Sequence, residues 1–183
     1  MIKKIFVFCF VLSNFLFAST LSDIENLYKQ GKYPLVCTQS GHIYTENKNN
    51  EKFLNMFADS CLKSDMINRI VLPIIKLYKT KQARENAAYF TTILYQKKML
   101  YYSLCDNIDI SYINLPKINY ILSKIFDKYI RGKYNLKDDA YWFKDDTDNE
   151  IRYKLSIETK NGIKKMYLRT YQNDNIIKTR VYW

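Results

Sequence analysis

The hydrophobic periodicity of the chain changes near residue 135, and this change limits the folds that are open to it. Between residues 19 and 135, apolar side chains recur every three or four positions, the spacing of amphipathic helices. After residue 135, apolar and polar side chains alternate, as in strands with one buried face. We therefore expect an α+β fold, in which an N-terminal bundle of about five helices precedes a C-terminal antiparallel β-meander of three to four strands.

Within the helical region, capping residues and helix breakers suggest where the helices begin and end. Ser22 and Glu25 have the spacing of a capping box, and Gly31 ends the helix that they begin. Pro73 either kinks or splits a helix that starts near residue 65. A long segment, about 82–104, is apolar on more than one side, so we expect it to lie at the centre of the bundle.

Three segments with strict alternation predict the strands of the meander. They cover residues 150–158, 163–171 and 176–183, and a further short strand is expected at 141–143. Asn161-Gly162 is a strong hairpin-turn signal, and Asn173-Asp174 marks a second turn. The face expected to pack on the helices carries Ile151, Tyr153, Leu155, Ile157, Met166, Leu168, Ile177, Val181 and Trp183. Residues 136–183 and the helical body, 19–135, should thus form one compact domain.

Residues 1–18 have the pattern of a signal peptide. Lys3 and Lys4 precede an apolar stretch that is shorter than the ~20 residues of a membrane-spanning helix, and Ala18 is a small residue at the expected cleavage site. Cleavage near Ala18 would leave about 165 residues in the periplasm or secreted. Leu16 is larger than the usual residue at its position, so the alternative is an uncleaved segment that tethers the domain to the inner membrane, facing the periplasm.

Export gives the cysteines an oxidising environment, in which a disulfide can form. Cys37, Cys61 and Cys105 remain after cleavage, so one pair is expected to form and one thiol to be left over. Cys37 and Cys61 lie equally far in sequence from Asn49, the midpoint of a helical hairpin, and we expect them to be bonded. A Cys61–Cys105 bond is the alternative, since its midpoint also falls near a helix break.

An aromatic–glycine–aromatic pattern, Tyr28, Gly31 and Tyr33, occurs in the segment that continues through Val36. It resembles the first half of a tetratricopeptide or Sel1-like helical hairpin, over residues 22–63. In those families glycine permits the tight turn and the aromatic rings fill the groove between paired helices. The resemblance implies a protein-binding helical scaffold rather than an enzyme.

The face of the meander that points away from the helices is the candidate binding surface. The whole chain has a net charge of +11, and loss of Lys3 and Lys4 lowers it to +9, which favours anionic partners. Basic and tyrosine side chains are expected to interleave on this face, together with Tyr182: Arg152, Lys154, Lys165, Tyr167, Arg169, Tyr171, Lys178 and Arg180. An ordinary solvated sheet face is the alternative interpretation. The expected partners are an envelope protein, an anionic polymer or a membrane surface, and export argues against nucleic acid.

Few residues suggest catalysis or metal binding. His42 is the only histidine, and Cys37, five residues before it, has no thiolate to offer when bonded. The acidic segment 145–150 lacks the glycine of a calcium loop, so neither a metal nor a cofactor is expected. The sequence favours an exported, non-catalytic binding or accessory protein of the cell envelope. The alternatives are a small envelope hydrolase that uses carboxylates such as Asp106, Asp109 and Asp146, or a secreted effector.

Overall fold

The first helix, α1 (Leu21–Lys29), is capped by Thr20, two residues before the predicted cap. The computed structural model describes residues 20–183, so the predicted signal peptide lies outside the described residues. The hydroxyl of Thr20 accepts the N–H of Asp23, and the Asp23 carboxylate accepts the N–H of Thr20. This reciprocal pair places a negative charge in the first turn, where the helix dipole favours it, and it replaces the expected Ser22–Glu25 cap.

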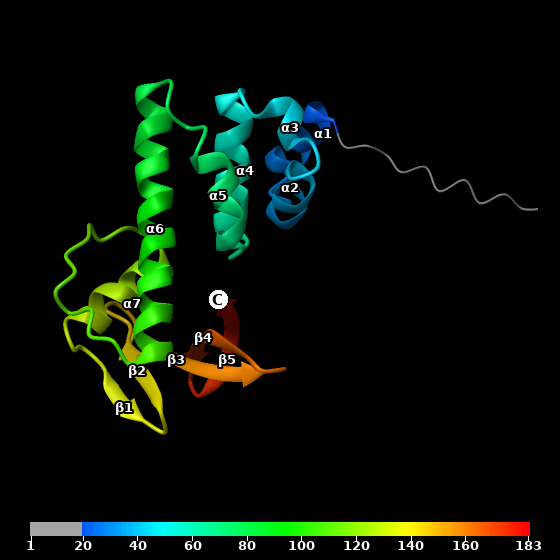
Figure 1. Cartoon of the computed structure of the whole chain (residues 1–183). Helices are drawn as coiled ribbons and strands as arrows, with labels where there is room; N and C mark the ends of the chain where they lie inside the picture. Colours follow the sequence, from blue (N-terminus) through cyan, green and yellow to red (C-terminus); the bar gives the residue numbers. More distant parts are fainter. Residues whose placement is uncertain (1–19) are drawn as a thin grey trace, which may run out of the picture.

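The α+β class is confirmed, but the helices within residues 20–183 number seven rather than about five, besides one 3₁₀ helix, η1 (Figure 1). After α1 they are α2 (Tyr33–Ser40), α3 (Tyr44–Asn47), α4 (Glu51–Lys63), η1 (Ile67–Ile70), α5 (Val71–Ile74), α6 (Lys81–Asp106) and α7 (Ile121–Ile130). Part of the difference lies around Pro73, which has no N–H to continue a regular helix. The single helix expected from residue 65 is therefore a pair of short turns, η1 and α5.

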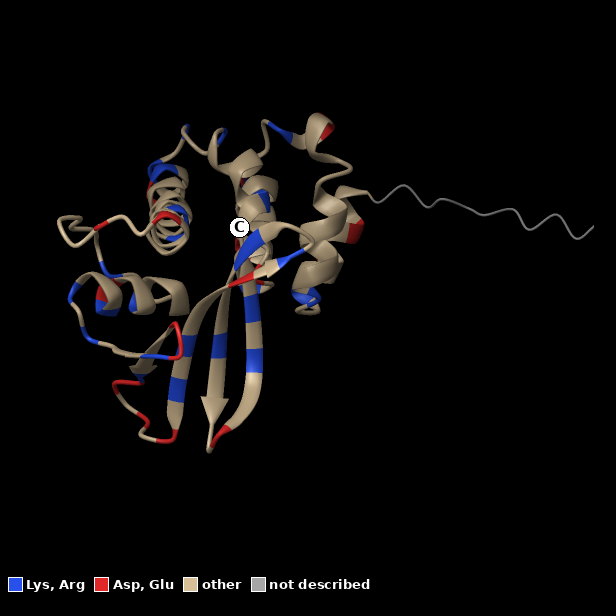
Figure 2. Cartoon of the chain, turned by 60° about the horizontal axis from the view of Figure 1, so that its bottom comes forward, with Lys and Arg blue, Asp and Glu red and all other residues tan. Residues whose placement is uncertain are grey.

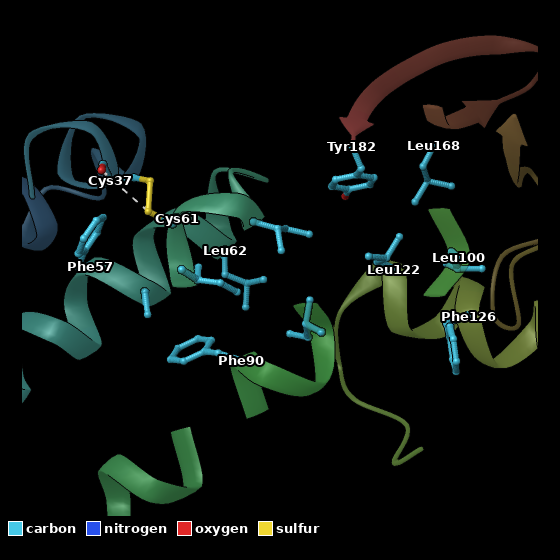
Figure 3. Close-up of a cluster of buried hydrophobic side chains, with 14 of the residues drawn as sticks. Cys37, Phe57, Cys61, Leu62, Phe90, Leu100, Leu122, Phe126, Leu168 and Tyr182 are labelled. Atoms are coloured by element: carbon cyan, nitrogen blue, oxygen red, sulfur yellow. Dashed lines mark hydrogen bonds between the residues drawn. A yellow bond between two sulfur atoms is a disulfide. The ribbon is translucent and has the colours of Figure 1, made fainter. Parts of the chain in front are cut away.

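Helices α2 and α4 pack against each other and carry the predicted disulfide. The Sγ atoms of Cys37 and Cys61 are 1.99 Å apart and their Cα atoms 4.8 Å apart, so this pairing is confirmed (Figure 3). Both cysteines are fully buried beside Phe53, Phe57 and Leu54. Cys105 is free and half-buried near the end of α6, so the Cys61–Cys105 alternative is wrong.

Helix α6 is the longest helix and extends from the helical hairpin to the sheet (Figure 1). Thr80 caps its first turn, and Asn107, in a left-handed conformation, ends it. One of its buried residues is charged: Lys97 is inaccessible to solvent. Its ammonium group donates to the side chain of Asn68 and, over 2.6 Å, to the main-chain oxygen of Trp183.

The C-terminal part is a five-stranded antiparallel sheet with strand order β1-β2-β3-β4-β5, a simple meander. Its strands are β1 (Asn135–Lys137), β2 (Ala140–Lys144), β3 (Ile151–Lys160), β4 (Ile163–Gln172) and β5 (Asn175–Tyr182). Three of the four connections are two-residue turns whose residues both have positive φ: Asp138-Asp139, Asn161-Gly162 and Asn173-Asp174. Asn, Asp and Gly tolerate this conformation best, so the two later turns were predictable from the sequence. The Asp138-Asp139 turn and the strand before it, β1, were not predicted, so three to four strands were an underestimate.

One face of the sheet packs on α6 and α7. Leu155, Met166 and Leu168 are fully buried there and belong to the same cluster of core side chains as those of the helices. Figure 3 shows Leu168 and Tyr182 of the sheet directed toward Leu122 and Leu100 of the helices. The buried face expected for β3 and β4 is thus confirmed.

The last strand, β5, presents the opposite face from the one predicted. Its inner positions hold Lys178, Arg180 and Tyr182, which pair with Thr170, Leu168 and Met166 of the buried face. Tyr182 is 2 % exposed, whereas Ile177 and Trp183, which were expected inside, are 54 % and 51 % exposed. The assignment was wrong because partners on other elements, Asp65 and Tyr120, satisfy the polar groups of β5.

Candidate functional site

The strand register brings six of the eight predicted binding residues onto one face. Arg152 of β3 lies opposite Tyr171 of β4, and Lys154 lies opposite Arg169. Tyr167 and Lys165 continue the same face toward the other end of β4. We call this surface, away from α6 and α7, the outer face of the sheet. In Figure 2, where the bottom of the Figure 1 view comes forward, Lys and Arg positions recur along the long strands.

The other two predicted residues, Lys178 and Arg180, belong to a different cluster on the inner side of β5. Lys178 Nζ lies 2.7 Å and Arg180 Nε 3.0 Å from the carboxylate of Asp65, which follows α4. The hydroxyl of Tyr120 donates to the same carboxylate over 2.9 Å. Burial, together with the nearby Tyr182 and Asp65, raises the pKa of Tyr120 far above its usual range. These two cations therefore hold the sheet to the helices and are not free for an external anion.

Aromatic rings interleave with the cations of the outer face. The rings of Trp142, in β2, and Tyr171 have centroids 5.2 Å apart. Arg152 and Lys154 lie over the Trp142 ring at 5.9 and 5.5 Å from its centroid. Arg169 lies 4.8 Å from the Tyr167 centroid. The negative faces of the rings stabilise these cations without neutralising them.

Carboxylates balance only part of the charge of the outer face. Glu158 accepts a hydrogen bond from Arg169, which is the main reason that its pKa is lowered. Asp174, at the turn before β5, forms an ion pair with Arg152. Within the described residues, Lys144 and Lys154 form no ion pair with a carboxylate. A net positive surface remains along the strands.

Two hollows lie on either side of Trp142. Tyr171, Arg152 and Asp174 contribute to the first, of about 370 Å³. Tyr134 and Lys133 contribute to the second, of about 380 Å³. Three residues line both hollows, and we call them the ridge: Asn135, Trp142 and Lys144.

Sequence reasoning missed the residues of this ridge. The short strand at 141–143 was expected, and alternation with buried Phe143 would have placed Trp142 and Lys144 on the outer face. Asn135 carried no signal, because β1 is three residues long and exposed throughout. The pairing of Asn135 with Trp142 depends on the β1–β2 register, which only the structure gives.

A further hollow, of about 550 Å³, is lined by residues of α1, α4 and α6. Tyr28 and Tyr89 contribute to its lining. Its polar groups bond one another: the Tyr28 hydroxyl donates to Asp59 over 2.7 Å, and the Asn86 amide donates to Asn55 over 2.8 Å. This helical groove is a protein-binding candidate whose polar side chains already have partners.

The candidate catalytic and calcium-binding residues have local structural roles. Asp145 accepts bonds from the Tyr153 hydroxyl and from the N–H groups of Thr147 and Asp148, which hold its pKa far below the usual range. Asp109 similarly accepts the N–H of Ser111 within its own loop. No group of three or more His, Cys, Asp or Glu side chains within residues 20–183 is arranged to hold a metal ion. The acidic segment 145–150 is a hydrogen-bonded turn between β2 and β3.

Of the other two carboxylates considered for hydrolysis, Asp106 is exposed at the end of α6, and Asp146 lies 2.6 Å from the ammonium group of Lys128. That hydrogen bond is the main reason that its pKa is lowered, so Asp146 is unsuited to act as a general acid near neutral pH. His42 lies in the loop after α2, and the bonded Cys37 cannot act as a nucleophile. Asp146 and Cys37 are therefore both engaged with other groups of the chain.

Comparisons with protein families, with curated protein sequences and with solved structures find no match for this chain. Among the helices of residues 20–183, none combines the length and the apolar character that crossing a membrane requires.

Proposed function

We propose that the chain is an exported, non-catalytic protein of the cell envelope that binds an anionic polymer through the outer face of the sheet. The observation that carries this proposal is the row of cations and aromatic rings on that face, only partly balanced by Glu158 and Asp174. Cations provide the attraction to an anion, and rings provide flat contact area with little loss of conformational freedom.

The extent of the outer face favours a polymer over a small anion. Lys165 and Tyr171 are six positions apart on β4, which corresponds to about 20 Å along an extended strand. Cations also recur across neighbouring strands, from Lys144 of β2 through Arg152 of β3. A chain of repeated negative groups could contact several of these side chains at once.

The outer face is a better binding candidate than the helical groove. In the groove, Tyr28 already donates to Asp59 and Asn86 to Asn55, so a ligand would have to break these bonds. On the outer face, Lys144 and Lys154 have no ion pair to lose within residues 20–183. The buried disulfide is compatible with the predicted export, and export directs the proposal toward an envelope polymer.

A double charge reversal, Lys144→Glu with Lys154→Glu, tests the proposal. The probes are polygalacturonate and long-chain polyphosphate, with binding measured by calorimetry over a series of NaCl concentrations. We expect the wild-type chain to bind both probes with a marked salt dependence, and the variant to bind far more weakly. The slope of log affinity against log salt should fall by about two, one for each lysine.

Lys32→Glu with Lys81→Glu is the matched control, because it makes the same change in net charge at exposed positions of the helical body. We expect this control to bind nearly as well as the wild type. Equal loss of binding in both variants would mean that only net charge matters and would contradict the proposal. Binding of the wild type to phosphatidylglycerol vesicles, with none to either polymer, would assign the face to a membrane surface instead.

A further inference from the structure

We infer that the two hollows beside Trp142 form a saccharide subsite, and that the anionic polymer is an acidic glycan whose sugar rings lie against Trp142. This inference rests on the proposed function and specifies its ligand. The two hollows, of about 370 and 380 Å³, fall at the lower end of the ~300–1,000 Å³ that is typical of small-molecule sites. Because the hollows share a ridge, successive sugar residues of one chain could occupy both.

The aromatic lining of both hollows suits a ring-shaped ligand. Tyr171 and Trp142, with centroids 5.2 Å apart, line the first hollow, and Tyr134 faces the second. Sugar rings present flat C–H surfaces that pack on aromatic rings. A polyanion without rings, such as polyphosphate, would use the cations of the outer face but leave this aromatic surface unused.

The polar lining suits hydroxyl groups as well as a negative charge. The Asn135 side chain is exposed on the ridge and offers both a donor and an acceptor. The carboxylate of Asp174 adds an acceptor in the first hollow, next to the cation of Arg152. A lining made only for phosphate would gain nothing from a carboxylate, whereas a sugar hydroxyl can donate to it.

The acidic group of the sugar would meet Lys144. This lysine lies on the shared ridge, is exposed and has no ion pair within residues 20–183. The indole Nε1 of Trp142 is a further donor, buried and without a hydrogen-bond partner in the described part of the chain. A ligand oxygen that reached this N–H would supply the acceptor that it lacks.

The two tryptophans of the chain allow a direct optical test. Trp183→Phe leaves Trp142 as the only indole. The substitution changes an exposed side chain, and it keeps the main-chain oxygen of residue 183 that accepts the hydrogen bond from Lys97. We expect trigalacturonate to shift the Trp142 emission and to protect it from acrylamide quenching. Tripolyphosphate should bind without either effect.

The reverse variant, Trp142→Phe, leaves Trp183 as an indole outside the hollows and is the matched control. Because the Trp183 ring lies 5.2 Å from Lys165 of the outer face, its emission should respond alike to trigalacturonate and to tripolyphosphate. Trp142→Leu should weaken trigalacturonate binding about tenfold or more, the size expected for a lost stacking contact, and leave tripolyphosphate binding unchanged. Circular dichroism melting checks that both variants fold.

Two failures are distinguishable. If the wild type binds trigalacturonate and tripolyphosphate equally and Trp142 emission responds to neither, the saccharide subsite is wrong and the proposed function stands. If neither these oligomers nor the long polymers bind, the proposed function itself fails. The Trp183→Phe measurement leaves the hollows intact, so it decides the question even if the Trp142 variants do not fold.

Discussion

Burial makes the charge of Lys97 sensitive to pH. Burial, with a smaller effect of Lys98, lowers the pKa of its ammonium group from 10.5 to about 8. The hydrogen bonds to Asn68 and to the Trp183 main chain use two of the three ammonium protons, and neither acceptor belongs to an acidic side chain. The folded protein therefore holds the Lys97 proton less tightly than the unfolded chain does.

We predict that this difference in pKa makes the protein more stable as pH rises above about 8. Both states are protonated below that pH; between about 8 and 10.5 the unfolded chain binds more protons, so the free energy of unfolding increases with pH. The expected gain between pH 7 and 9.5 is about 2 kcal/mol. Urea unfolding at both pH values measures it.

Lys97→Met provides the control for that rise in stability. The variant has no titrating group at this position, so the rise between pH 7 and 9.5 should disappear from its unfolding curves. A rise of the same size in the variant would show that another group causes it. Neither outcome depends on whether the variant is more or less stable than the wild type at pH 7.

Residue-level sequence patterns predicted local bonds best where few partners compete. Cys37 and Cys61 were paired correctly because an expected hairpin placed them symmetrically and only three cysteines follow residue 18. The first helix cap was misplaced because Thr20 and Ser22 can both cap, and Asp23 and Glu25 can both complete the box. Choosing between such similar pairs requires the geometry of the chain before the helix.

At the scale of elements, the disulfide fixes the α2–α4 pair. It joins residues 24 apart in sequence, and restricting the unfolded chain over such a loop stabilises a protein by about 3 kcal/mol. We predict that Cys37→Ser with Cys61→Ser lowers the free energy of unfolding by about this amount, measured by urea unfolding without reductant.

Cys105→Ser is the matched control for the disulfide variant. Cys105 is a free, half-buried thiol, so its replacement should change stability little and leave the effect of a reductant intact. If dithiothreitol destabilised the disulfide variant as much as the wild type, the Cys37–Cys61 bond would not be the cause. Alkylation of both cysteines in the native, non-reduced protein would also contradict the pairing.

Strands were predicted well where one face meets the core, and poorly at the edges of the sheet. In β3 and β4, alternation placed Leu155 and Leu168 inside correctly. In β5 the apolar residues suggested the wrong face, because polar partners in the connections of the helical half, Asp65 and Tyr120, pack against Tyr182 and Arg180 instead. The candidate binding site was also predicted unevenly. Its six predicted residues lie on β3 and β4, whereas the ridge depends on the pairing of Asn135 with Trp142, and β1, which carries Asn135, was not predicted.

At the scale of the whole molecule, Asp65 connects the two halves. It lies between α4 and η1 with a φ of 58°, and it binds Lys178 and Arg180 of β5 and Tyr120 before α7. Both Arg180 and Asp65 are mostly buried, with side chains 13 % and 16 % exposed. Removing one member of such a pair leaves the other charge without compensation.

We predict that Asp65→Asn destabilises the fold by about 3 kcal/mol, because it removes the charge that compensates the cations of β5. Asn is the replacement of choice because it tolerates a positive φ as Asp does. Asp138→Asn is the matched control: Asp138 also has a positive φ, of 52°, but it is exposed and forms no ion pair among the described residues. Urea unfolding should show a loss for the first variant alone. Equal stability of the two variants would mean that Asp65 does not connect the halves.

The ion pair between Asp65 and Arg180 also determines when the molecule can finish folding. A ribosome makes the carboxylate first and its partner 115 residues later, while each hairpin of the meander pairs segments that are made in succession. During synthesis the helical hairpin and the first strands can therefore form early, since domains acquire structure from the N-terminus onward. β3 and β4 can pack on α6 and α7 before β5 is made, but a nascent chain halted before Lys178 would lack both ion pairs that join β5 to Asp65.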